Sequence, residues 1–428
     1  MSFLRWYSYN KYYCIFMKKN KSLHFNNLRP ICVTLLSLAV ILTACEDTSI
    51  SDITEISSNL KEVSKVKDKA IQQAMDLVTD LGVITRGALA EEEVETFYVW
   101  TREDFLKSTG VTNISCSPND TLMYIVNFRN NKGYVILSAT SPSPEILAYV
   151  ENGTLNPTSP ISDEWLCMFL RRTMSMNCSP EFSAPLLPPS DDFVSWTVDT
   201  IFGPFLTTIW NQGEPFNSFC PIINGRHCPA GCVAIATGQI AAYHEHPSSY
   251  NGSFFDWKSI KEDTIPLVTW DILSVASLIS DIGRIVNMNY MEEESLVKRD
   301  SIVYSLDSLG YHHSDLVDYD FQSCVLELEQ NRPVYMIGEG VRNNGKPYGH
   351  SWLIDGCLIR SVHAYRIDKP NIIIRDLIQR LVHCNWGFIK GRTGYFRSDA
   401  FDPSTPVHVT RAGIDSNIVM IKDIYPND

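Results

Sequence analysis

Hydrophobic and polar positions change their spacing along this chain, and each spacing predicts a different kind of structure. Between residues 67 and 83 apolar side chains recur at helical intervals on one side: Ala70, Met75, Leu77, Val78 and Leu81. From Thr96 on, short apolar runs separated by turn residues take over. They predict strands of a small antiparallel sheet at 97–100, 122–126, 133–137 and 146–150, with a hairpin turn from Asn130 to Gly133.

Helical spacing returns over residues 161–176, and a stretch rich in Pro and Ser follows at 179–192. Such a stretch is typical of a boundary between domains. We therefore expect one small domain over residues 67–190 and a second domain over residues 191–428. The polar segment 45–66 is expected to be a tether, and residues 1–44 a leader.

The first 44 residues have the pattern of a secretory signal, with six basic residues, no acidic one, and the apolar run Ile31 to Leu42 at the end. This run is shorter than the roughly 20 residues of a membrane-spanning helix. Leu42-Thr43-Ala44-Cys45 resembles a bacterial lipobox, which predicts export, acylation of Cys45 and a lipid anchor in the cell envelope membrane. A buried helix with a chance cysteine is the alternative. Met17, before two lysines, is an alternative start.

Composition narrows the class of protein and its partners. With 44% hydrophobic and 20% charged residues, the chain is ordinary globular material. Loss of the leader takes six of the 36 basic residues and none of the 49 acidic ones, so the rest is strongly acidic and nucleic acid is not expected as a partner.

Nine cysteines follow Cys45, an odd number that leaves at least one free thiol in an exported protein. They form neither a C-x-x-C pair nor a C-x-x-H pattern, so no metal and no other cofactor is expected. Cys220 and Cys228 are spaced to close a small disulfide loop, and free buried thiols are the alternative.

The second domain holds the candidate chemistry, beginning with Cys232. A buried stripe recurs at helical spacing between Gly231 and His244: Val233, Ala236, Ile240 and Tyr243. A helix is therefore expected to begin at about Cys232, where the helix dipole and unpaired N–H groups favour a thiolate, lower its pKa and can receive an oxyanion. Taken alone, a cysteine in so tightly packed a helix is more often a core thiol.

A thiolate nucleophile needs a histidine as base and acid, a group that orients its imidazole, and an oxyanion donor. His350 begins an apolar strand that is expected to end at an Asp355-Gly356 turn. Asn385 ends a second strand, where its side chain can accept a hydrogen bond from one imidazole nitrogen. Trp386 can shield that hydrogen bond from water. Gln212 lies in a loop before Cys232 and is a suitable oxyanion donor. Taken alone, each has a commoner interpretation: a core histidine, a chance Asn-Trp pair, a surface glutamine.

In their order along the chain, these motifs resemble the streptopain family of papain-like cysteine peptidases. The matching motifs are Leu206 to Asn217, Cys220-Pro221, Gly231 to His244, Pro247, Phe255 to Trp257, Arg332 to Val334, Gly349 to Gly356, and Asn385 to Phe396. The resemblance implies an α+β fold with a two-lobed peptidase domain, in which a helical lobe carries the cysteine and an antiparallel sheet lobe carries the histidine. It also implies that residues 67–190 are a small α+β propeptide that blocks the cleft as an intramolecular inhibitor, so that the chain is a zymogen.

Carried over by position, the resemblance implies the following roles: Cys232 as nucleophile, His350 as general acid/base, Gln212 as oxyanion donor, Asn385 as orienter of His350 and Trp386 as shield. Such an enzyme hydrolyses peptide bonds of protein or peptide substrates through a thioester. The chain departs from the family pattern at Phe388, where a Trp-Gly usually repeats, and at Gly238 in mid-helix. The alternatives are a catalytically inactive relative that acts as a binding or inhibitory module, and a papain-like acyltransferase or amidase.

Overall fold

The computed structural model describes residues 50–83, 87–110, 120–139, 144–161, 164–177, 196–262, 269–341, 346–366, 369–388, 392–402 and 417–427. The chain divides into two units, Met1–Ser64 and Lys65–Asp428. Helix α3 (Ile50–Asp80) begins in the first unit, so the segment expected to be a tether is helical from Ile50. The leader, Cys45 and the boundary stretch 179–192 lie outside the described residues.

The N-terminal part of the second unit, residues 65–177, has the predicted strands and helices. Its strands are β1 (Val94–Thr101), β2 (Thr121–Phe128), β3 (Tyr134–Ser138) and β4 (Glu145–Val150), and each pairs with the next in antiparallel fashion. Short helices α4 (Ala90–Glu93) and α5 (Arg102–Thr109) flank β1, and α6 (Glu164–Asn177) confirms the second predicted helix. The β2–β3 hairpin turns because Asn130 and Asn131, both at φ 58°, tolerate the left-handed region.

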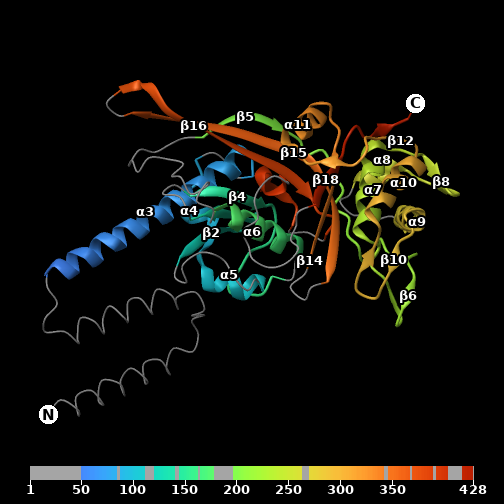
Figure 1. Ribbon diagram of the computed structural model, residues 1–428, viewed down its shortest axis with the longest axis horizontal. Helices are drawn as coiled ribbons and strands as arrows, with labels where there is room; N and C mark the ends of the chain where they lie inside the picture. Colours follow the sequence, from blue (N-terminus) through green and yellow to red (C-terminus); the bar gives the residue numbers. More distant parts are fainter. Residues whose placement is uncertain are drawn as a thin grey trace, which may run out of the picture. The chain divides into compact units, whose positions relative to one another are not determined.

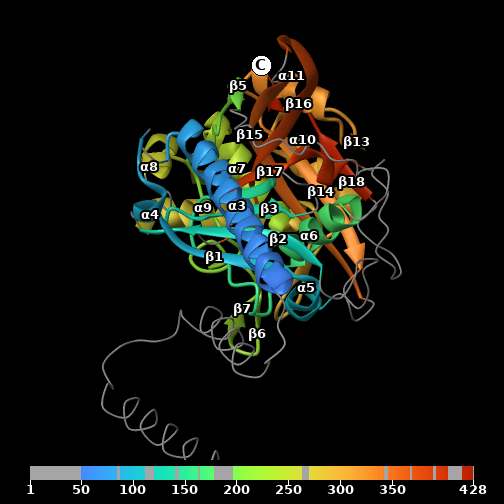
Figure 2. The same cartoon turned by 90° about the vertical axis from the view of Figure 1, so that its left-hand side faces the viewer.

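The part of helix α3 that belongs to the second unit, Lys65–Asp80, covers one face of this four-stranded sheet (Figure 2). Of the predicted apolar stripe, Ala70, Met75, Leu77 and Val78 are buried, together with Ala74, whereas Leu81 is half-buried just after the helix. The stripe packs on Val126, Val135 and Leu137 of β2 and β3. Because each buried large aliphatic side chain contributes roughly 1.5–3 kcal/mol, this stripe is sufficient to hold the helix on the sheet.

The C-terminal part, residues 196–427, contributes the other strands of the same sheet. These are β5 (Thr197–Phe202), β13 (Val317–Asp318), β14 (Val334–Val341), β15 (Pro347–Arg366), β16 (Lys369–Asn385), β17 (Gly394–Arg397) and β18 (Asn417–Ile421). Within the described ranges they and β1–β4 form one 11-stranded antiparallel sheet, in the order β1-β2-β3-β4-β17-β16-β15-β14-β18-β13, with β5 beside β15. Strand β4 pairs with β17, so the N-terminal part extends the sheet of the C-terminal part.

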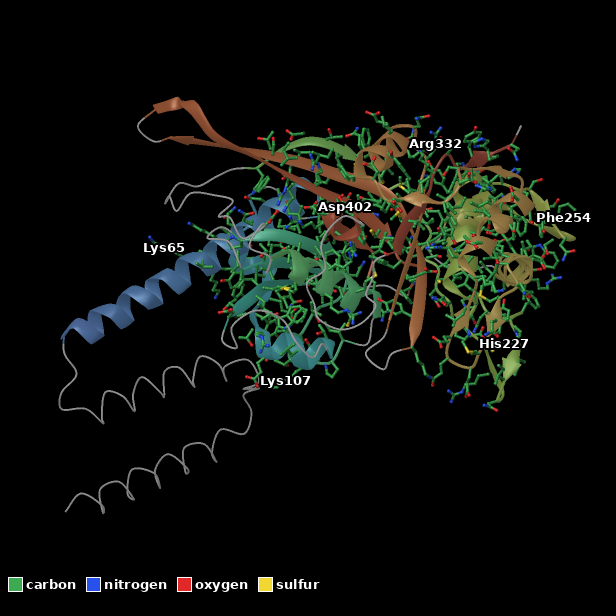
Figure 3. All side chains as sticks on the ribbon, viewed as in Figure 1. Lys65, Lys107, His227, Phe254, Arg332 and Asp402 are labelled. Atoms are coloured by element: carbon green, nitrogen blue, oxygen red, sulfur yellow. The ribbon has the colours of Figure 1, made fainter. Side chains whose placement is uncertain are left out.

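Charged side chains join the two parts at both ends of β4. Glu145 Oε2 lies 3.0 Å from Arg397 Nη1 on β17, and Glu151 Oε1, just after β4, lies 3.1 Å from His383 Nε2 on β16. Buried Arg172 on α6 makes a third link, since its Nη2 donates to the carbonyl oxygen of Asp402 at 2.6 Å. Figure 3 labels Asp402. The N-terminal part is therefore docked by main-chain pairing and by specific polar contacts.

Strand β15 runs straight through Asp355-Gly356, where the sequence predicts a turn. A register shift against β16 between Ile354 and Gly356 takes the place of that turn. Gly356 is required there because a Cβ would lie 2.7 Å from the carbonyl oxygen of Phe202 on β5. The predicted turn is wrong because β5 and β16, which are distant in sequence, pair with β15 and extend it.

Helices form the other lobe, on the far side of β14 and β18 from β1–β4 (Figure 1). They are α7 (Cys232–His244), α8 (Trp257–Glu262), α9 (Thr269–Ile285) and α10 (Val303–Ser308), with the 3-10 helix η1 (Arg299–Ser301). Helix α11 (Phe321–Glu329) and the 3-10 helix η2 (Ser398–Phe401) pack instead in the core that β1–β4 and α6 share with the C-terminal strands. Short hairpins and bridges complete the C-terminal part: β6 (Ile222–Ile223) with β7 (Arg226–His227), β8 (Ser249–Tyr250) with β9 (Ser253–Phe254), β10 (Asn289–Tyr290) with β11 (Ser295–Leu296), and β12 (Tyr311–His312) with β19 (Tyr425–Pro426).

The mid-helix glycine of α7 is explained by close packing. A Cβ on Gly238 would lie 2.6 Å from Ile279 Cδ1 of α9 and 3.2 Å from the Trp210 ring. A glycine inside a helix costs roughly 1 kcal/mol relative to alanine. Here it allows α7 to approach both α9 and the segment that leads into Gln212.

Six cysteines in the described part of the chain are free thiols: Cys220, Cys228, Cys232, Cys324, Cys357 and Cys384. Cys220 and Cys228 therefore do not form the disulfide that their spacing allows. Among the helices that the structure describes, none combines the length and the apolar character needed to cross a bilayer.

Candidate active site

Cys232 occupies the first position of α7, as the sequence predicts. The preceding residue, Gly231, adopts φ 87° and ψ 134°, a conformation that favours glycine. A Cβ at Gly231 would also lie 2.5 Å from Met288 Cε. The glycine therefore lets the chain turn sharply into the helix, and Cys232 stands half-buried at its N-terminus.

The thiol of Cys232 is nevertheless not activated. Burial raises its pKa above the ordinary value, and hydrogen bonds from Ser351 and from the N–H groups of Val233 and Cys232 only partly oppose this. The lowered pKa expected from the helix N-terminus is therefore wrong for this structure, because loss of solvation disfavours the thiolate more than these donors favour it.

His350 lies on β15 inside a stack of aromatic rings and is only 8% exposed. Its ring centroid is 4.8 Å from that of Phe388, 6.1 Å from Trp386 and 6.2 Å from Trp352. Burial lowers the pKa of His350 to about 4, with the Trp386 carbonyl opposing this shift and Arg392 adding to it. The imidazole is therefore neutral at neutral pH.

The hydrogen bonds of His350 are not those of an assembled catalytic dyad. Its Nε2 pairs with the carbonyl oxygen of Trp386 at 2.9 Å, whereas the sequence predicts Asn385 as its partner. Cys232 and His350, both within the described residues, share no hydrogen bond. They still lie close in the fold, since Ser351, the residue after His350, is hydrogen-bonded to the Cys232 sulfur. The site combines a neutral imidazole with a protonated thiol.

Asn385 ends β16 and is buried, with its side-chain amide fully bonded elsewhere. Its Nδ2 donates to the carbonyl oxygen of Thr208 at 2.9 Å and to Gln239 Oε1 at 3.1 Å. Its Oδ1 accepts from the Gly387 N–H at 3.2 Å. The structure thus brings Asn385 into the site but does not join it to His350.

Gln212 lies beside the entry to α7. Its carbonyl oxygen accepts a hydrogen bond of 2.8 Å from the N–H of Ala230, two residues before Cys232. The residue is half-buried, and its side-chain amide makes no hydrogen bond to any described residue. An unoccupied amide donor next to a helix N-terminus can stabilise an oxyanion.

Trp386 forms part of the hydrophobic core under His350. It is fully buried and stacks on Trp352, with ring centroids 4.8 Å apart. Its ring also contacts Phe396 on β17, whose ring in turn meets Phe169 of α6 at 5.1 Å. A continuous aromatic cluster therefore runs from the N-terminal part of the chain to the candidate histidine.

Three residues of the site have no assigned role in the sequence analysis. Phe388, noted there as a departure, stacks directly on His350. Gln239 bonds to Asn385, and the only local signal for it is an amide in a helix of small and apolar residues. His383 is hydrogen-bonded to both Asp355 and Glu151. The only sequence signal for a role of His383 is its position two residues before Asn385.

No group of three or more His, Cys, Asp or Glu side chains in the described ranges is arranged to hold a metal ion. The chemistry that these residues can perform is nucleophilic attack by sulfur, with proton transfer by an imidazole.

Two protein-family profiles match this chain. Residues 210–396 match the profile described as Peptidase C10 family, over the segment that contains Gln212, Cys232, His350 and Asn385. This segment belongs to the Peptidase C10 family. Residues 66–174 match the profile described as Spi protease inhibitor. The chain is thus a cysteine endopeptidase with an N-terminal inhibitor domain. Residues 65–177 form the inhibitor domain, and residues 196–427 form the peptidase domain.

Relatives of this C10 peptidase agree with that assignment. Streptopain of Streptococcus pyogenes is 25% identical over 339 residues, which cover 66% of this chain and 75% of streptopain. The thiol protease/hemagglutinin PrtT of Porphyromonas gingivalis is 22% identical over 373 residues, 76% of this chain and 40% of PrtT.

A solved structure is similar to both domains of the C10 chain. A fragment of prointerpain A from Prevotella intermedia has a TM-score of 0.51 and 18% identity, and the match covers 74% of this chain and 99% of the fragment. The similarity concerns the fold. It confirms the predicted α+β class, a papain-like two-lobed peptidase preceded by a small α+β propeptide.

Proposed function

We propose that Cys232 is the nucleophile of this C10 peptidase, with His350 as general acid/base and Gln212 as oxyanion donor. In this proposal Asn385 orients the imidazole and Trp386 shields it. The observation that carries the proposal is the contact between α7 and β15. There the Cys232 sulfur, at the helix N-terminus, is hydrogen-bonded to Ser351, the residue after His350.

These groups support hydrolysis of protein or peptide substrates by way of a thioester. The thiolate sulfur of Cys232 attacks the peptide carbonyl carbon, and the oxyanion that forms is held by the Gln212 amide and N–H groups of α7. His350 then donates its proton to the amine as the C–N bond breaks. Water attacks the thioester, His350 takes its proton, and the thiolate leaves.

The structure corresponds to the resting state of a zymogen in this proposal. Attack requires a thiolate and an imidazolium, whereas here the pKa of Cys232 is raised and that of His350 is lowered, both through burial. The aromatic cluster beneath His350 includes Phe169 of the inhibitor domain. Removal of that domain changes the packing under His350 and lets the imidazole leave the Trp386 carbonyl for Cys232.

Intact mass spectrometry of the purified full chain over time tests this proposal. The unmodified chain is expected to shorten within residues 175–200 by self-cleavage, while Cys232→Ala stays intact. Cys228→Ala is the matched control and is expected to shorten like the unmodified chain, because this buried cysteine lies outside the site. A chain that neither shortens nor hydrolyses peptides would instead be a binding or inhibitory module.

We also propose that the chain is exported and anchored to the bacterial cell envelope by lipid on Cys45. The support is the basic leader, the apolar run and the lipobox-like Leu42 to Cys45. Growth with an alkyne fatty acid is expected to label the chain, Cys45→Ser to abolish the label, and Cys116→Ser to keep it. Equal labelling of Cys45→Ser would contradict the anchor and leave the peptidase assignment intact.

A further inference from the structure

Gln239 is a buried amide in the middle of the helix that begins with Cys232. It lies two turns after Cys232 and is 0% exposed. Its neighbours on α7, Ile235, Ala236 and Ile240, are buried apolar side chains. A buried amide without partners destabilises a fold, so its hydrogen bonds indicate why a glutamine occupies this position.

The Gln239 amide joins two segments that carry other candidate groups. Its Oε1 accepts from Asn385 Nδ2 at 3.1 Å, from Thr208 Oγ1 at 3.2 Å and from the Trp210 N–H at 3.3 Å. Its Nε2 donates to Asn385 Oδ1 at 3.4 Å. One side chain therefore connects the helix of Cys232, the segment that leads into Gln212, and the end of β16.

The Asn385 amide is held in one orientation by these contacts. The Thr208 carbonyl can only accept, so it selects Nδ2, and the Gly387 N–H can only donate, so it selects Oδ1. Gln239 bonds to both atoms of the amide at once and reinforces this orientation. A side chain with a single polar atom would not do so.

We infer that Gln239 is a positioning residue of the peptidase, acting through Asn385 and through the segment of Gln212; the inference rests on the proposed function. When His350 moves to Cys232, its second imidazole nitrogen needs an acceptor, which Asn385 Oδ1 supplies. The 3.4 Å bond from Gln239 Nε2 is the longest on that oxygen and is the one that His350 replaces. Gln239 Oε1 then keeps Asn385 Nδ2 turned away from the imidazole.

Gln239→Met in the full chain, processed where necessary by added unmodified enzyme, tests the inference. Methionine keeps the length of the side chain and removes its hydrogen bonds. We expect kcat to fall about tenfold to hundredfold, because small displacements of catalytic groups have effects of this size, and KM to change little. The alkaline limb of the kcat/KM profile should move to lower pH, because a misplaced Asn385 stabilises the imidazolium less.

The matched control is Tyr243→Phe. Tyr243 also lies on α7, but its hydroxyl donates to the carbonyl oxygen of Asn331 at 2.6 Å, in the last turn of the helix and away from Cys232, so its kcat and pH profile should stay unchanged. If Gln239→Met does not fold, Thr208→Val removes one of the bonds to Gln239 and should lower kcat about threefold to tenfold. An unchanged kcat in that folded variant would then overturn the inference.

Asn385→Ala and the double variant Gln239→Met/Asn385→Ala separate this inference from the proposed function. An unchanged kcat in Asn385→Ala would refute the proposed role of Asn385 itself. If Asn385→Ala lowers kcat, the kcat of the double variant should lie within about twofold to threefold of the kcat of Asn385→Ala, since both changes remove the same function. Full multiplication of the two effects, or an unmoved pH limb in Gln239→Met, would overturn the inference.

Discussion

Glu151→Gln removes a negative charge at the contact between the inhibitor domain and the peptidase domain. In the unmodified chain this carboxylate bonds to Nε2 of buried His383, whose Nδ1 lies 2.5 Å from Asp355 Oδ1. Burial lowers the pKa of His383, but Asp355 and Glu151 outweigh burial and raise it to about 10. The histidine is therefore a cation at neutral pH and holds the end of β4.

The magnitude follows from the kind of bond that is lost. A hydrogen bond to a charged group contributes about 1.5–3 kcal/mol, and the Glu151 side chain is 30% exposed, so solvent screens part of this. We expect Glu151→Gln to lower the free energy of unfolding by about 1–2 kcal/mol at neutral pH.

The pH dependence has a defined sign. The pKa of His383 is raised from 6.5 to about 10 in the fold. Its contribution to the free energy of unfolding is therefore complete below pH 6.5 and is lost as the pH rises through about 10. Burial raises the pKa of Glu151, but His383 lowers it overall, so the contribution of Glu151 is complete above pH 4.5 and is lost in acid. The effect of Glu151→Gln should therefore nearly vanish at about pH 10.5.

Urea denaturation of the full chain, with Cys232→Ala present to prevent self-cleavage, measures this difference. Glu145→Gln is the matched control, because Glu145 joins the other end of β4 to Arg397, whose guanidinium keeps its charge in alkaline solution. The change that it makes to the free energy of unfolding should be the same at both pH values. An effect of Glu151→Gln that is absent at neutral pH, or equally large at about pH 10.5, would refute the reasoning.

Three further predictions concern the neighbourhood of Cys232. Gly231→Ala should destabilise the chain by about 1–3 kcal/mol in urea denaturation, because φ 87° strains a residue with a Cβ; an unchanged midpoint would contradict this. Gly238→Val should lower the free energy of unfolding by about 1–3 kcal/mol, because the added side chain overpacks against Trp210. A more stable variant would show that helix propensity, and not packing, decides the stability at this position. Iodoacetamide should modify Cys232 of the full chain at a rate that keeps rising above pH 9.0, because burial raises its pKa; a plateau below that pH would disprove the raised pKa.

Local features of the fold could be predicted from the sequence because their signals are local. The apolar stripe of α3 and the short runs of β1 to β4 bury the side chains that the spacing indicates. The start of α7 at Cys232 follows from the glycine before it and from the small residues after it. The positions of Gln212, His350 and Asn385 near this helix came from the family resemblance.

Contacts between distant segments could not be predicted in this way. Asp355-Gly356 is a turn signal in isolation, and only β5 and β16 convert it into a continuous strand. The pairing of β4 with β17 joins segments whose sequences carry no sign of one another. The raised pKa of Cys232 depends on how deeply the tertiary fold buries the thiol, which helix position alone does not give.

Labelling with a thiol-alkylating epoxide, followed by peptide mapping, tests the central claim most directly. The processed chain is expected to carry one label, on Cys232, whereas the full chain and a processed His350→Ala variant should carry none there. Processed chain with intact His350 that is not labelled on Cys232 would contradict the account.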